Sequence, residues 1–288
     1  MGVYHAGSRA VQDRAGVRDR ADHVGRSLGQ TIKPVAAAFL EQQPLLIVAA
    51  ADPGTGRVWA SALTGAPGFM RAADPRRMSV HTADPLGARL RGRPVGTLAL
   101  DPRTRRRMRL NGRLHPTPEG FTVDADQVFA NCPKYIQRRE TYETVDRAPG
   151  TPRRLTRFGT EEADFIGAAD TFFLATVHRA GADAGHRGGN PGFVRVTSPH
   201  ELTWPDYAGN AMFLSLGNLH ADPRAGLLFL DWETGTTLQL TGEARTGFGP
   251  DGTRTVRFTL AEARWTPAAL PLRWSAPEYS PANPDPAR

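Results

Sequence analysis

Short apolar runs bounded by Pro, Gly or Asp recur along most of the chain. The first run, at 44–52, predicts a buried strand that ends at the turn 52–56, and the run at 57–63 predicts its hairpin partner. Short strands at turn-bounded intervals favour a sheet or barrel over a βαβ layout. The runs of the first half are PLLIVAAAD (44–52), RVWASAL (57–63), RMSVHT (77–82), PVGTLALD (94–101) and RRMRLNGRL (106–114).

Other stretches predict the connections between these strands. Residues 1–30 alternate Arg and Asp with small apolar residues, which favours an amphipathic helical arm. Asn131 can cap a helix that carries Pro133 in its first turn. Residues 146–157 are rich in Pro, Gly and Arg, as linkers are, and the last segment, APEYSPANPDPAR (276–288), has the composition of a disordered tail.

The second half of the chain repeats the first. Three pairs of segments match at a spacing of about 125–130 residues: PGFM (67–70) with PGFV (191–194), VGTLALD (95–101) with AGLLFLD (225–231), and 101–112 with 231–242. Two copies of a mostly β unit indicate duplication of a small sheet or barrel. We therefore expect a helical arm at 1–34, a first repeat with a C-terminal helix at 35–147, a linker at 148–164, a second repeat at 165–274 and a disordered tail at 275–288.

Composition narrows the choice of partners. The net charge of +7 comes almost wholly from arginine and permits nucleic acid or a phosphorylated ligand. The arginines are spread along the chain without a DNA- or RNA-reading motif, so we expect no nucleic acid. The only cysteine, Cys132, excludes an intrachain disulfide, and its flanking residues favour a structural role. With neither a signal-peptide core nor a membrane-spanning apolar run, the sequence predicts a cytoplasmic protein that contacts no membrane.

The stretch GHRGGNPGF (185–193) places His186 and Arg187 among glycines. Glycine lets a main chain approach a ligand closely, and arginine offers a planar fork of donors to phosphate or carboxylate. The stretch is consistent either with an anion cradle or with a Gly-Pro turn that exposes its arginine. The formal GxGxxG at 247–252 precedes a strand and indicates a hairpin turn. His178, Asp183 and His186 fit no standard ligand spacing, so no metal site is expected.

The segment MFLSLGNLHADPRAGLLFLDW (212–232) reads as a strand, a polar turn, a short helical segment and an apolar strand. It resembles the flavin-nucleotide-binding split barrel, the family of pyridoxamine 5'-phosphate oxidase. The matching residues are Phe213, Ser215, Asn218, Asp222-Pro223 and 226–232. With HAGSRAVQDRAGV, NCPKYIQRR and HRGGNPGFVRV, the pattern is similar to a tandem subfamily and covers residues from about 5 to about 274. The resemblance implies a tandem FMN-binding split β-barrel.

The resemblance also implies site residues. Arg187, with the backbone of Gly188 and Gly189, would hold the flavin phosphate, and Ser215 and Asn218 would complete the cradle. Gly185 stands where the subfamily has Ser, which removes one hydroxyl donor and makes His186 more important as a donor. His186 is equally consistent with a hydrogen-bonded hairpin residue.

The first repeat would supply the opposite wall of the cleft, either within one chain or across a homodimer. The candidates are Trp59, Ser61, Arg107 and Arg109. Alternation puts Arg107 and Arg109 on one strand face with Asn111. Trp59 is equally a core candidate, and arginine clusters often form a solvated strand face. Trp232 would pack near the isoalloxazine or act as a structural plug.

The resemblance implies an FMN-dependent oxidoreductase whose substrate is unknown, reduced by a nicotinamide or protein electron donor. Two alternatives stay open. One is a non-enzymatic protein that binds flavin or another flat cofactor, haem or deazaflavin, and the other is a scaffold with a decayed site.

Overall fold

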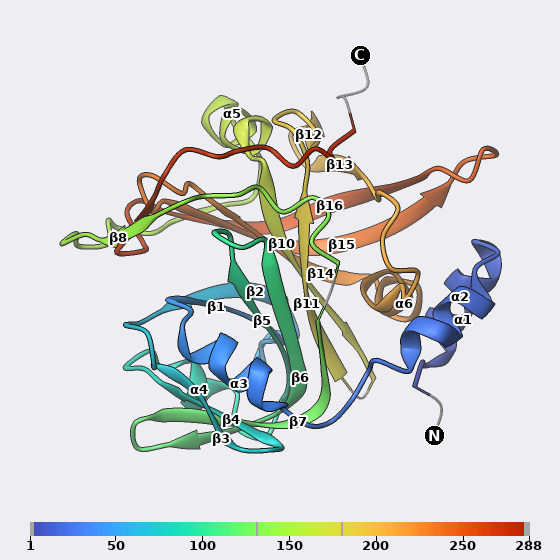
Figure 1. The fold of residues 1–288 in the computed structure, drawn as a ribbon. Coiled ribbons are helices and arrows are strands. Elements are labelled where there is room, and N and C mark those ends of the chain that lie inside the picture. The colour runs from blue at the N-terminus through green and yellow to red at the C-terminus, as the bar shows by residue number, and fades with distance from the viewer. Residues whose placement is uncertain (1–2, 131, 180, 285–288) are drawn as a thin grey trace.

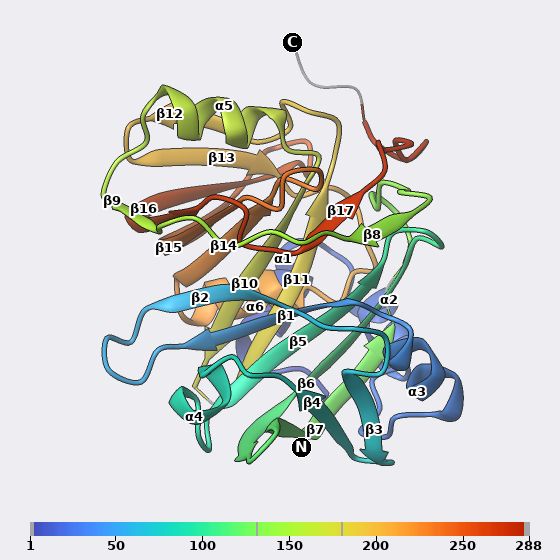
Figure 2. The same ribbon diagram turned by 90° about the vertical axis from the view of Figure 1, so that its left-hand side faces the viewer.

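The computed structural model describes residues 3–130, 132–179 and 181–284. Two antiparallel sheets lie against each other, with short helices at their edges (Figures 1 and 2). The first sheet contains β1 (Leu45–Ala51), β2 (Val58–Thr64), β3 (Met70–Asp74), β4 (Arg77–His81), β5 (Pro94–Asp101), β6 (Arg106–Thr117) and β7 (Gly120–Ala130). Its strand order is β2-β1-β5-β6-β7-β4-β3.

The second sheet has the same plan. It contains β10 (Thr171–His178), β11 (Gly181–Gly188), β12 (Arg195–Ser198), β13 (Glu201–Pro205), β14 (Arg224–Leu230), β15 (Thr237–Phe248) and β16 (Arg254–Thr266). Its order, β11-β10-β14-β15-β16-β13-β12, is the first order repeated, and β9 (Arg153–Leu155) adds to β16. The mainly β tandem fold expected from the sequence is confirmed.

The helices follow the same duplication. Helix α3 (Pro34–Glu41) precedes β1 as α5 (Thr160–Ala168) precedes β10. Helix α4 (Leu86–Arg89) and helix α6 (Leu214–Ala221) each lead into the fifth strand of their repeat. The arm at the N-terminus forms α1 (Ala6–Arg14) and α2 (Arg18–Gly25), and α1 packs on α6 of the second repeat (Figure 1). No helix in the described ranges is long and apolar enough to cross a membrane.

Strand β1 shows why these runs are apolar throughout rather than alternating. Leu46 and Val48 point into the core of the first repeat, whereas Leu45 and Ile47 point into a core shared with the second. Strand β10 is divided in the same way, with Phe172 inside its own repeat and Phe173 in the shared core. Burial on both faces requires a continuous apolar sequence.

Two glycines at matching places allow the repeats to approach closely. A Cβ on Gly96 of β5 would lie 2.5 Å from Cα of Asp183 on β11. A Cβ on Gly226 of β14 would lie 2.8 Å from Cα of Trp59 on β2. No side chain fits at such distances, which explains why both copies of the repeated segment carry glycine at this point.

Two expected elements differ from the structure. The helix expected after Asn131, a residue outside the described ranges, is absent: residues 132–141 are turns and extended chain with an isolated bridge from Arg138 to Glu278. The reason is that this segment pairs with the C-terminal residues: the backbone N–H of Arg138 donates to the carbonyl of Glu278 over 2.9 Å, and that of Glu278 to the carbonyl of Arg138 over 2.8 Å. Residues 275–284, expected to be disordered, pack there: Ser280 is buried, and Asn283 donates to Gln137 over 3.0 Å. A small ribbon of β8 (Tyr142–Thr144) and β17 (Leu272–Trp274) adjoins them.

Candidate functional site

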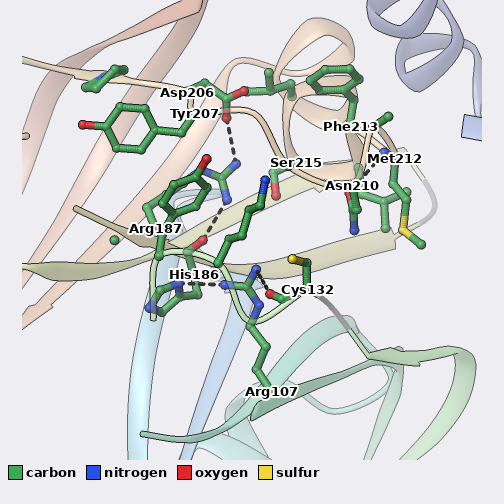
Figure 3. A pocket seen from close by; sticks show the side chains of 18 of the residues that line it. Arg107, Cys132, His186, Arg187, Asp206, Tyr207, Asn210, Met212, Phe213 and Ser215 are labelled. Atoms are coloured by element: carbon green, nitrogen blue, oxygen red, sulfur yellow. Dashed lines mark hydrogen bonds and ion pairs between the residues drawn. The ribbon is translucent and has the colours of Figure 1, made fainter. Parts of the chain in front are cut away.

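A cavity of about 110 Å³ lies between the two repeats and is called here the cationic cavity. Strand β6 of the first repeat and strand β11 of the second form its walls, and the N-terminus of α6 closes one side (Figure 3). The side chains that define it are Arg107, Arg109, Lys134, His186, Arg187 and Ser215. Residues from both repeats therefore meet in one site within a single chain.

Arg107 carries a positive charge that has no acidic partner among the described residues. Its Nη1 donates to Nδ1 of His186 over 2.7 Å, and its Nη2 donates to the carbonyl of Cys132 over 3.1 Å. Its Nε has no partner in the part of the chain described. Burial, followed by the charges of Arg109 and Arg187, lowers the pKa of Arg107 to about 9. The folded protein thus holds this guanidinium in an unfavourable place unless an anion joins it.

His186 is buried beside Arg107. Burial, with the nearby Arg107, Arg187 and Arg109, lowers the pKa of His186 well below its ordinary value, so the ring is neutral. Arginine can only donate, so Nδ1 of His186 accepts and Nε2 carries the proton. That Nε2 is buried without a partner in the described structure. His186 therefore offers one further donor at this wall.

In Figure 3 the side chain of Arg187 points towards Asp206, on the side of the cavity away from Arg107. Its Nη2 lies 3.6 Å from Oδ1 of Asp206, and its Nη1 donates to the carbonyl of His186 over 3.1 Å. Asp206 is shared, because Nε of Arg254 donates to its other oxygen over 2.9 Å. Burial lowers the pKa of Arg187, against the attraction of Asp206.

Asp183 organises the deeper part of the site. It is 2% exposed and accepts from Nη1 of Arg109 over 2.9 Å, from Asn111 over 3.1 Å and from Oγ of Ser215 over 2.8 Å. Arg109 and Ser215 are therefore oriented by a carboxylate. Strand alternation does place Arg107, Arg109 and Asn111 on one face towards this site.

The donor set fits an anion. Four cationic side chains line or adjoin the cavity, and the carboxylates that face them are Asp183 and Asp206. The Nε atoms of Arg107, Arg109 and Arg187 are buried without partners in the described structure. The N-terminus of α6 adds main-chain donors of the kind that bind phosphate. A phosphate group would supply the missing acceptors.

Backbone strain is concentrated at the same place. Tyr135, Ala211 and Phe213 line the cavity and have positive φ angles of 64°, 63° and 52°. Non-glycine residues rarely adopt this conformation and do so most often at functional sites. Gly185 also belongs to the site, because its Cβ would lie 3.0 Å from Oγ of Ser215 and 3.2 Å from Nη1 of Arg187. Glycine there leaves room that a serine side chain would take.

The structure does not bring every candidate to this cavity. Gly188 lines it, whereas Gly189 lies beyond, with its amide donating to the carbonyl of Asp170 over 3.0 Å. Asn218 lies one turn further along α6 and bonds to Thr176 over 3.0 Å and to His5 over 2.9 Å. Trp232 lines another cavity, because it follows the far end of β14.

Trp59 and Ser61 lie in a different cleft, of about 250 Å³, called here the Trp59 cleft. It is formed by β2 and α4 of the first repeat and β15 of the second. Gln239 donates to the carbonyl of Ala60 over 2.8 Å, and the guanidinium of Arg264 stacks 4.0 Å above the ring of Trp59.

Asp183 and Asp206 are parts of the site that were not predicted from the sequence. Asp183 was considered only as a metal ligand, although a charged residue within a strand of small residues is itself a sign of a buried partner. Lys134 and Tyr135 were assigned to a helix and so were not considered. Among the described residues no group of His, Cys, Asp or Glu could hold a metal ion.

Comparison with known proteins agrees with the fold. Residues 158–281 match the model of the pyridoxamine 5'-phosphate oxidase family. No curated protein matches the chain. Among solved structures, HupZ from Group A Streptococcus is similar at 13% identity over 36% of this chain and 89% of that chain, with a TM-score of 0.28.

Two further structures show a similar extent of likeness. One, a putative pyridoxamine 5'-phosphate oxidase from Listeria innocua, has 10% identity over 36% of this chain and 94% of that chain, with a TM-score of 0.30. The other, an FAD-binding protein from Mycobacterium smegmatis, has 13% identity over 39% of this chain and 97% of that chain, with a TM-score of 0.27.

The architecture is that of a split β-barrel protein with a tandem arrangement. The stretch that matches the model of the pyridoxamine 5'-phosphate oxidase family, residues 158–281, covers the second repeat.

Proposed function

We propose that the chain binds FMN and that the cationic cavity holds the FMN phosphate. The observation that carries this proposal is the cluster of Arg107, Arg187 and His186, in which Nε of both arginines and Nε2 of the histidine are buried without an acceptor in the described structure. Arg107 of the first repeat and Arg187 of the second line the same cavity, so one phosphate in it would accept hydrogen bonds from both. Asp183 would keep Arg109 and the Ser215 hydroxyl oriented beside them.

The family match supports a flavin over other phosphorylated ligands. FAD is the competing form, since the similar protein from Mycobacterium smegmatis is described as FAD-binding. A terminal phosphate suits a small cavity better than a pyrophosphate that continues to an adenosine, which favours FMN. Both walls come from one chain, so one chain would suffice for the site.

We further propose that the protein is an oxidoreductase. Bound flavin would supply hydride or electron transfer, and the chain would hold and orient it. The substrate is not specified by any side chain described above. A nicotinamide or protein donor would reduce the flavin, and bleaching of the flavin absorbance on addition of NADH or NADPH would distinguish an enzyme from a carrier.

The test is fluorescence titration of FMN and riboflavin with the wild type, Arg187→Ala and Arg106→Ala. Arg106 is exposed on the other face of β6, so it is the matched control. We expect Arg187→Ala to weaken FMN binding at least tenfold, or about 1.4 kcal/mol, through loss of a bidentate phosphate contact.

Riboflavin lacks the phosphate, so its affinity should be the same in all three proteins. Unchanged FMN affinity in Arg187→Ala would remove the phosphate from this cavity. Equal loss of FMN and riboflavin would place Arg187 at another part of the ligand.

A further inference from the structure

A cavity of about 540 Å³ lies away from the cationic cavity, beside the ribbon of β8 and β17, and is called here the Arg139 cavity. Its walls come from the end of α5, the start of β10, the turn after β14, and β17 with the residues up to Tyr279. The volume is within the range of pockets that hold small organic ligands, about 300–1,000 Å³.

Aromatic rings form much of this cavity. Trp232, Trp274, Phe165 and Tyr279 all line it. Trp274 meets Trp232 edge to face, with ring centres 5.8 Å apart and planes at 88°. Tyr279 is 45% exposed, which is unusual for a large apolar side chain and leaves one side of the cavity open. Such walls suit a flat ring.

A buried ion pair lies among these rings. Nη2 of Arg139 donates to Oδ2 of Asp170 over 2.9 Å, and each side chain is 6% exposed. The guanidinium of Arg139 also lies 4.6 Å above the ring of Trp232. The two opposite charges cancel, so a charged ligand would leave one of them opposed by a like charge.

Three polar atoms of this group have no partner in the described structure: Nε of Arg139, Nε1 of Trp232 and Oδ1 of Asp170. Two are donors and one is an acceptor. A buried ion pair that served only the fold would be expected to have these atoms bonded, because each unbonded polar atom is costly. All three residues line the same cavity.

We propose that the Arg139 cavity binds a neutral, planar aromatic ligand that carries an amide. The amide carbonyl would accept from Arg139 and Trp232, and the amide N–H would donate to Asp170. The three atoms are shielded in the free protein, so these side chains would turn towards the ligand as it enters. The proposal does not depend on the flavin, because Phe173 stands between Trp232 and His186, with ring centres 6.5 Å and 6.0 Å from them.

The probes are benzamide, acetophenone and benzoate, measured by saturation-transfer NMR and by quenching of tryptophan fluorescence without added flavin. Acetophenone has the shape and carbonyl of benzamide but no N–H, and benzoate has a negative charge. We expect benzamide to bind with a dissociation constant in the millimolar range, as for a small fragment, and the other two to bind at least fivefold more weakly.

Two variants locate the site. Trp232→Phe keeps an aromatic ring, although a smaller one, and removes the N–H, and Asp170→Asn keeps the shape and removes the charge. Each should weaken benzamide binding at least threefold, whereas Trp59→Phe, in the Trp59 cleft, should leave it unchanged. If Asp170→Asn fails to fold, Trp232→Phe decides alone. No benzamide binding, equal binding of acetophenone, or full binding in Trp232→Phe would each overturn the proposal.

Discussion

The cationic cavity and the Trp59 cleft occupy matching places in the two repeats but differ in chemistry. Counting from the matched glycines, Gly96 and Gly226, pairs Arg107 with Thr237 and Arg109 with Gln239. Thr237 and Gln239 do line the Trp59 cleft, beside β2 and α4, as the two arginines line the cationic cavity beside β11 and α6. The two repeats share this architecture, but only the first carries arginines at these two strand positions.

The charges of the Trp59 cleft are also neutralised differently. Nε of Arg264 donates to Glu262 over 3.1 Å, and Arg89 donates to Asp52 over 2.9 Å. Each of these two arginines contacts a carboxylate, although Glu262 is shared with Arg57, whereas Arg107 has no carboxylate partner among the described residues. A surplus of unpaired cations, more than the shape of the cleft, distinguishes the proposed phosphate site.

The largest expected difference between the two places concerns stability. Asp183→Asn would leave Arg109 buried without its counter-charge, so we expect a loss of about 3 kcal/mol in the free energy of unfolding. Gln239→Ala, in the Trp59 cleft at the position that matches Arg109, removes a hydrogen bond and should cost about 1 kcal/mol. Urea denaturation of both variants measures this. Equal losses would show that Asp183 is no more than an ordinary polar residue.

The paired glycines provide the next test. Gly96→Ala and Gly226→Ala both place a Cβ against backbone of the other repeat, and each should cost about 1–3 kcal/mol through overpacking. Gly96→Ala displaces Asp183 and should also weaken FMN binding, whereas Gly226→Ala should not. Thermal unfolding and FMN titration give the two readings. Equal FMN affinities in the two variants would show that the contact between Gly96 and Asp183 does not affect FMN binding.

A smaller effect depends on pH. The pKa of His186 is lower in the folded protein than in the unfolded chain. Its effect on the free energy of unfolding is therefore absent above about pH 6.5, and the free energy of unfolding decreases as pH falls below that value. The slope is at most about 1.4 kcal/mol per pH unit for one proton.

His186→Gln should remove this part of the slope and leave that of His178, whose pKa is also lowered by burial and by His5. Urea denaturation between pH 7 and pH 5 measures both. An unchanged slope in His186→Gln would mean that His186 binds its proton equally in the folded and unfolded states.

The sequence predicted the strands and the duplication because both depend on local pattern. Burial on two faces made the runs of β1 and β10 apolar, and the glycines at 96 and 226 repeated for a steric reason. Strand alternation also identified Arg107 and Arg109 as neighbours. The GxGxxG at 247–252 does form the hairpin between β15 and β16.

The remaining features depend on contacts between distant segments. Ser215 lies at the cavity and Asn218 does not, because three residues along α6 move a side chain most of a turn away from the helix N-terminus. A helix was expected after Asn131, but residues 132–141 pair with the C-terminal residues instead. No local sequence pattern indicates such pairing between distant segments. Asp206 reaches Arg187 only through the loop before α6.

The docking of α1 on α6 has a consequence for synthesis of the protein. The ribosome makes the N-terminal arm first, but the partners of the arm come about 200 residues later. Gln12 donates to the carbonyl of Met212, and His5 bonds to Asn218. A ribosome adding about 5–20 residues per second needs roughly 10–40 s to reach α6 after α1 has emerged. Throughout that time α1 lacks the α6 surface on which it packs, and the apolar residues of β1 and β5 that join the shared core are uncovered. The nascent chain must therefore tolerate an exposed apolar sheet until its second half is complete.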